Sequence, residues 1–118
     1  MRPAFAPGLA ALLLALPVPA LAHAIVVAAE PAAGAVLHGE EAKLMLRFNS
    51  RIDAERSRLT LIFPDGGAHP LRLTASDAPD TLAAAIDGLG AGAYRLRWQV
   101  LAVDGHITRG DIPFTVAP

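Results

Sequence analysis

The chain of 118 residues contains no cysteine. This absence excludes disulfide bonds, zinc–thiolate sites, cysteine nucleophiles and a lipid anchor on an N-terminal cysteine. A strong excess of either charge is also missing, because 10 Lys and Arg residues stand against 11 Asp and Glu residues. Without a basic patch, neither nucleic acid nor an anionic lipid surface is expected as a partner.

The first 22 residues have the pattern of a cleaved signal peptide. Arg2 is the only charged residue among them, an apolar stretch follows at 9–16, and Ala20 and Ala22 place small residues where a signal peptidase reads them. An anchoring helix is the alternative, but a spanning helix needs about 20 continuous apolar residues without proline breaks. We therefore expect cleavage after Ala22 and export, and a secreted domain without disulfides fits a bacterial periplasm.

The remaining residues, 23–118, suffice for one small domain in which the dominant hydrophobic period is two. In 94–100, four apolar residues alternate with Arg95, Arg97 and Gln99, which is typical of a half-buried strand. Turn signals rich in Gly, Pro and Asp separate such segments, and no segment longer than a turn reads as a helix. About seven short strands at this spacing predict an all-β sandwich with Greek-key connections. The expected strands are 25–29, 44–48, 59–63, 68–73, 82–86, 94–100 and 112–116.

His23 becomes the first residue of the mature chain if cleavage follows Ala22. Its α-amine, with a reference pKa of about 7.7–8.0, and its imidazole Nδ1 can then close a chelate ring on one metal ion. Two nitrogen donors in a fixed bite favour tetragonal sites, for which copper(II) stands first in the Irving–Williams order. Alternatively, His23 merely adjoins a cleavage site, and taken alone this is the simpler interpretation.

Asp104 and His106 directly follow the strand with the clearest alternation. Residues two apart on a strand project from the same face, so the carboxylate and the imidazole can converge on one point, with the small Gly105 between them. The alternative is an ordinary turn, because Asp-Gly is a favoured hairpin dipeptide. By itself the tripeptide does not decide between a site and a turn.

The order and spacing of several motifs resemble those of the CopC family of periplasmic copper-resistance proteins. These motifs are His23-Ala at the cleavage point, Pro-Ala-Ala-Gly at 31–34, Leu-Arg-Phe ending at Phe48, Gly-Ala-Tyr-Arg-Leu-Arg-Trp at 92–98, Val-Asp-Gly-His at 103–106 and Gly-Asp-Ile-Pro-Phe at 110–114. The resemblance covers essentially the whole mature chain. It implies an immunoglobulin-like Greek-key sandwich or barrel and a copper(II) site made by His23, Asp104 and His106.

The chain departs from the family pattern near the second predicted strand. Many members carry a carboxylate shortly after its phenylalanine, whereas Asn49 and Ser50 follow Phe48 here. Loss of a supporting acid can lower metal affinity about 10- to 100-fold. We therefore expect a weaker or differently supported site, with Asp53 as the nearest other acid.

The chain is not expected to bind copper(I). Some relatives hold that ion in a methionine-rich loop, because soft thioethers suit it. The mature chain has only Met45, and a thioether site cannot be assembled from one methionine. His38 and His69 have no paired ligand in sequence and are interpreted as solvated loop residues.

The leading functional hypothesis is a copper(II) carrier or buffer without enzymatic activity, monomeric and without membrane insertion of the mature chain. The resemblance implies a CopD-type inner-membrane copper transporter as a partner. An alternative is a small histidine-brace copper oxidase or monooxygenase, although about 96 mature residues leave little room for a polysaccharide-binding face. A further alternative is an immunoglobulin-like interaction module whose histidines bind no metal.

The assignment of His23 as a ligand predicts where the exported protein begins. Cleavage after Ala22 leaves His23 at the terminus, whereas the small residue Ala24 also permits a later cut that would delete His23. Intact-mass measurement of the exported protein is expected to show a chain that starts at His23. A mass corresponding to a start at Ile25 would remove the chelating terminus from the hypothesis.

Overall fold

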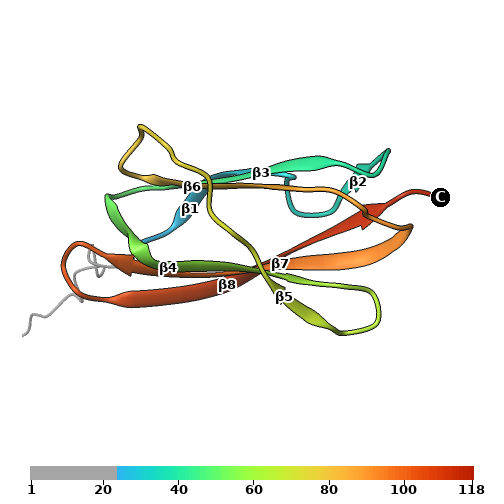
Figure 1. Cartoon of the computed structure of the whole chain (residues 1–118). Coiled ribbons are helices and arrows are strands. Elements are labelled where there is room, and N and C mark those ends of the chain that lie inside the picture. The colour runs from blue at the N-terminus through green and yellow to red at the C-terminus, as the bar shows by residue number, and fades with distance from the viewer. Residues whose placement is uncertain (1–23) are drawn as a thin grey trace, which may run out of the picture.

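The computed structural model describes residues 24–118, which form eight β-strands in two facing sheets (Figure 1). The smaller sheet has the order β1–β3–β6, formed by Val26–Glu30, Ala42–Phe48 and Thr81–Ile86. The larger sheet has the order β2–β8–β7–β4–β5, formed by Ala35–Leu37, Ile107–Val116, Gly92–Ala102, Ile52–Ile62 and Ala68–Pro70. Residues 1–22, expected to be the signal peptide, and His23 lie outside the described residues.

The predicted all-β sandwich is confirmed, and in residues 24–118 no helix is long and apolar enough to cross a membrane. Every strand pair is antiparallel except β2 with β8. β2 was not among the expected strands, because three residues are too few to show a period and it pairs only with the end of β8. β5 is shorter than the expected 68–73: its ladder with β4 ends at Pro70, and the chain then crosses to the other sheet, where Thr74 bridges Ala83.

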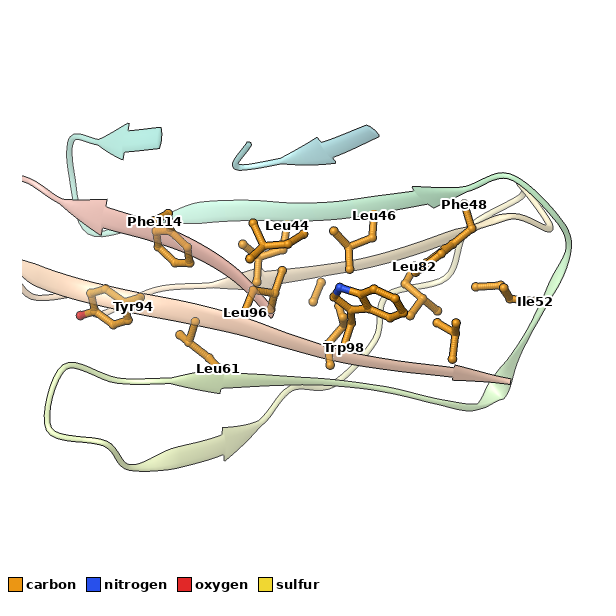
Figure 2. Packing of buried hydrophobic residues seen from close by; sticks show 14 of the residues in the cluster. Leu44, Leu46, Phe48, Ile52, Leu61, Leu82, Tyr94, Leu96, Trp98 and Phe114 are labelled. Carbon is orange, nitrogen blue, oxygen red and sulfur yellow. The ribbon is translucent and has the colours of Figure 1, made fainter. Parts of the chain in front are cut away.

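The core lies between the two sheets and is built from the inward positions of the alternating strands (Figure 2). Trp98, one of the four apolar residues in 94–100, is 8% exposed and belongs to the core. Its ring packs edge-on against Phe48 of the smaller sheet, with ring centroids 5.3 Å apart. Other side chains that Figure 2 labels in this cluster are Leu44, Leu46, Ile52, Leu61, Leu82, Tyr94, Leu96 and Phe114.

The entry into β7 has the geometry of a tyrosine corner, a feature of Greek-key sandwiches. The Tyr94 hydroxyl donates to the Gly90 carbonyl at 2.8 Å, four residues earlier in the chain. Leu89, just before that carbonyl, is 3% exposed and belongs to the core. The corner therefore attaches the connection from β6 to the larger sheet.

The close approach of β8 to Trp98 predicts a strong effect of one added methyl group. Gly110 is the register partner of Trp98, and a Cβ at Gly110 would lie 2.5 Å from the indole ring. We expect Gly110→Ala to destabilise the protein by about 1–3 kcal/mol, because the ring or the strand has to shift. Urea unfolding measures the change.

Gly90→Ala is the matched control, because a Cβ at Gly90 meets nothing within 4 Å. Its free energy of unfolding should change by much less than that of Gly110→Ala. Equal effects of the two substitutions would contradict this account of the Trp98 packing.

Candidate metal centre

Three segments from different parts of the chain meet at one end of the sandwich (Figure 1). They are the start of β1, the turn of residues 49–51 between β3 and β4, and the loop of residues 103–106 between β7 and β8. The turn contacts both other segments: Asn49 N donates to the Ile25 carbonyl at 2.9 Å, and Val103 N donates to the Arg51 carbonyl at 3.4 Å. This end therefore brings the loop that carries Asp104 and His106, and the turn that carries Asn49, close to the first described residues of the chain.

The loop between β7 and β8 is a tight, closed turn. Ala102 N donates to the His106 carbonyl at 2.8 Å, and Gly105 N donates to the Ala102 carbonyl at 2.9 Å. Gly105 has a φ of 93°, a left-handed conformation that favours glycine. The loop is thus a turn of the Asp-Gly type, with Asp104 and His106 between the two strands rather than on one of them.

Asp104 and His106 nevertheless converge, for a different physical reason from the expected one. Their side chains do not share a strand face; instead, the Asp104 carboxylate folds back over the turn. Its Oδ1 accepts a hydrogen bond from His106 N at 3.0 Å, as in an Asx turn, and lies 3.2 Å from His106 Nδ1. The turn itself therefore juxtaposes an oxygen donor and an imidazole.

The pair is accessible and electrostatically coupled. The side chain of His106 is 56% exposed and that of Asp104 is 38% exposed, so an ion can reach both from solvent. The pKa of the Asp104 carboxyl is lowered, mainly by the hydrogen bond from the His106 backbone, with smaller contributions from the His106 imidazole and opposition from desolvation. The carboxylate is therefore ionised at neutral pH, the state that binds a metal.

Asp104 and His106 do not make a complete metal site within residues 24–118, where no group of three His, Cys, Asp or Glu side chains gathers. Two exposed donors alone hold a metal weakly. His23, the third residue singled out by the sequence, lies before the first described residue. Ala24, which follows it directly, is 1% exposed and belongs to the core.

Asn49 and Ser50 occupy the positions where the family pattern has an acid, and the structure shows what each side chain contacts. The Asn49 side-chain Oδ1 accepts from Ile25 N at 2.9 Å, a contact that sequence reasoning missed. The Ser50 hydroxyl is buried and has no hydrogen-bond partner in the described part of the chain. Asp53, the nearest other acid, binds Arg56 through a 3.0 Å ion pair.

The other candidate donors lie apart from this loop. His38 is exposed and follows β2, whose partner residues lie at the opposite end of β8 from His106. His69 lies on β5, with its ring 4.2 Å from that of Phe63. Met45 is half-buried on β3, in the smaller sheet.

Three exposed aliphatic side chains also mark this end of the sandwich. Val103 and Ile107, which flank the pair, are 68% and 52% exposed, and Ile25 at the start of β1 is 57% exposed. Single exposed aliphatic residues are ordinary, but these three lie at the same end of the sandwich as the Asp104–His106 pair.

One family model and several solved structures match this chain. A family model described as the CopC domain matches residues 26–117. The crystal structure of CopC from Methylosinus trichosporium OB3b is 27% identical, with a TM-score of 0.73, and the match covers 81% of this chain and 95% of that one. PcoC, a methionine-rich copper resistance protein from Escherichia coli, is 25% identical with a TM-score of 0.63, over 80% of this chain and 99% of PcoC.

Two further similarities concern another bacterial protein and a solved structure of lower identity. Protein YobA of Escherichia coli K12 is 29% identical over 98 residues, which covers 80% of this chain and 79% of YobA. The fibronectin(III)-like modules of Clostridium thermocellum CbhA are 19% identical with a TM-score of 0.52, over 80% of this chain and 45% of that one. This last match concerns the fold alone and agrees with an immunoglobulin-like sandwich.

The lowered pKa of Asp104 predicts how the loop responds to pH. The pKa of Asp104 in the folded protein lies below the unfolded value of about 3.9. The ionised carboxylate therefore adds its full contribution to the stability of the folded protein above about pH 3.9, and this contribution is lost as the pH falls through the folded pKa. Carbon-13 NMR titration should show the Asp104 carboxyl titrating below a solvated aspartate. In His106→Ala most of the shift should remain, because the backbone N–H remains. An ordinary pKa in the wild-type protein would contradict the turn geometry.

Proposed function

Because the chain belongs to the CopC family, we propose that its mature form binds copper(II) in the periplasm and acts as a copper carrier or buffer in copper homeostasis or resistance. The similar proteins with solved structures include CopC and a copper resistance protein, PcoC. Residues 1–22 are proposed to be the cleaved signal peptide, and residues 23–118 the binding domain. The family match, which begins at residue 26, fits this division.

The observation that carries the proposal is the pairing of Asp104 with His106 at the end of the sandwich where the described chain begins. We propose that the α-amine and imidazole of His23, the imidazole of His106 and the carboxylate of Asp104 bind one copper ion. Three nitrogen donors and one oxygen donor suit a tetragonal copper(II) site. The 3.2 Å between Asp104 Oδ1 and His106 Nδ1 is short enough for an oxygen donor and a nitrogen donor to bind one ion.

The donor set supports copper(II) rather than copper(I). All the proposed donors are nitrogen or oxygen, whereas copper(I) favours soft thiolate or thioether ligands. The mature chain has no cysteine and only Met45, which lies half-buried on β3. PcoC is a methionine-rich copper resistance protein, and we propose that this chain, with one methionine in its mature form, has no copper(I) site.

A transfer partner is part of the proposal. A carrier has to pass its ion to another protein, and a CopD-type inner-membrane transporter is the partner that the family suggests. The exposed side chains of Ile25, Val103 and Ile107 support this, because they provide apolar contact area beside the proposed site. We propose a monomeric carrier that presents this end of the sandwich to the transporter.

A copper enzyme with a histidine brace is the second candidate, since the proposed amine and two imidazoles are the same donor types. Asp104 argues against it, because an ionised carboxylate beside the metal stabilises copper(II) and opposes the reduction that oxygen activation requires. Rapid ascorbate-driven peroxide production by the copper-loaded protein would favour the enzyme over the carrier.

Copper titration of the mature chain followed by electron paramagnetic resonance tests the proposed function. One axial copper(II) species with nitrogen hyperfine structure is expected at one equivalent, and it should be lost in His106→Ala because an imidazole donor is removed. His38→Ala is the matched control, since His38 is equally a surface histidine but lies near the opposite end of β8. Absence of stoichiometric binding by the wild-type protein would leave only the immunoglobulin-like module.

A further inference from the structure

We infer that Asn49 is a positioning residue for the proposed copper site, which acts by anchoring the N-terminal segment and not as a ligand. The inference rests on the proposed function, because it concerns how the amine and imidazole of His23 are brought to Asp104 and His106. It assigns a role to the position at which the sequence suggested a missing acid.

Two hydrogen bonds join Asn49 to Ile25. Asn49 N donates to the Ile25 carbonyl at 2.9 Å, and Ile25 N donates to the Asn49 side-chain Oδ1 at 2.9 Å. Val26 and Phe48 are the neighbouring register partners of β1 and β3, so Ile25 and Asn49 occupy the next rung of that antiparallel ladder.

In a regular ladder a backbone carbonyl would accept the hydrogen bond from Ile25 N. Here the carboxamide oxygen of Asn49 takes that place while the chain turns towards β4. The side chain therefore extends the ladder by one residue past the end of β3. An aliphatic residue of similar size lacks the acceptor and cannot do so.

The anchor fixes the chain immediately after the proposed ligand. Ala24 is 1% exposed in the core, and Ile25 is held by both hydrogen bonds to Asn49. Anchoring the chain at Ala24 and Ile25 lowers the conformational entropy that is lost when the terminus binds a metal.

The same turn is also tied to the loop that carries the other two proposed ligands. The Arg51 carbonyl accepts from Val103 N at 3.4 Å, and Ile52 is the register partner of Ala102. Val103 directly precedes Asp104. One short turn thus holds the N-terminal segment at Asn49 and the ligand loop at Arg51, so Asn49 sets the position of the terminus relative to the Asp104–His106 pair.

The Asn49 carboxamide supplies the acceptor oxygen that Ile25 N needs. The substitution Asn49→Asp is nearly isosteric and retains the acceptor oxygen, so it is the conservative variant. Asn49→Leu, in contrast, removes the acceptor at similar volume.

The test compares the wild-type mature chain with Asn49→Leu, Asn49→Asp and the control Gln99→Leu. Gln99 also accepts a side-chain hydrogen bond, from Arg109 Nε at 2.8 Å, but on the outer face of β7 and β8. Copper(II) affinity is measured by competition with a chelator of known affinity. Amide hydrogen exchange of Ile25 is followed in the metal-free protein.

Asn49→Leu is expected to weaken copper(II) binding about 10- to 100-fold and to speed exchange of the Ile25 amide roughly tenfold. In Asn49→Asp, the copper(II) affinity and the exchange rate of the Ile25 amide should both stay within a few-fold of the wild type. Gln99→Leu should change neither quantity. When the α-amine is acetylated, Asn49→Leu should cost less copper affinity than it does in the free chain, because the anchor then positions only the imidazole of His23.

Unchanged copper affinity in Asn49→Leu would overturn the inference. So would a loss of affinity caused by Asn49→Leu that is as large in the acetylated chain as in the chain with a free α-amine. Unchanged exchange of the Ile25 amide would overturn it without involving copper. Failure of the wild-type mature chain to bind one equivalent of copper would instead overturn the proposed function, and the exchange data would still report whether Asn49 anchors Ile25.

Discussion

The packing of Phe48 against Trp98 is the contact on which the arrangement of the proposed site depends. Phe48 is the last residue of β3 and Trp98 lies four residues before the end of β7, so their edge-on contact fixes the two strands relative to each other. Gly110 allows this packing, because β8 passes so close to the indole ring that no side chain fits there. A site assembled from loops is therefore held by a rigid core.

Much of the fold followed from the period-two pattern, because inward apolar residues in strands such as β7 have to be buried together. The pattern could not show β2, whose three residues are defined only by their partner β8. Nor could it show the crossing after Pro70, which depends on contacts with the other sheet. Short elements specified by distant partners leave little trace in local sequence.

The proposed site was predictable in part. Asp104 and His106 were singled out correctly as neighbours in space, but strand geometry was the wrong reason, since the Asp104 carboxylate folds over the turn to the His106 backbone. In the sequence, Asn49 marks only the absence of an acid. Its bond to Ile25 joins residues 24 positions apart, and such a contact cannot be derived from spacing along the chain. Whether His23 completes the site depends on processing, since only cleavage creates its free amine.

The central claim is that copper(II) binds where the mature terminus meets the Asp104–His106 turn. A crystal structure of the copper-loaded chain 23–118, with anomalous data collected at the copper edge, tests it most directly. The account predicts one copper ion at this end of the sandwich, bonded to the α-amine and imidazole of His23, the imidazole of His106 and the carboxylate of Asp104. Copper bound at His38 or His69 instead, with Asp104 and His106 uninvolved, would contradict it.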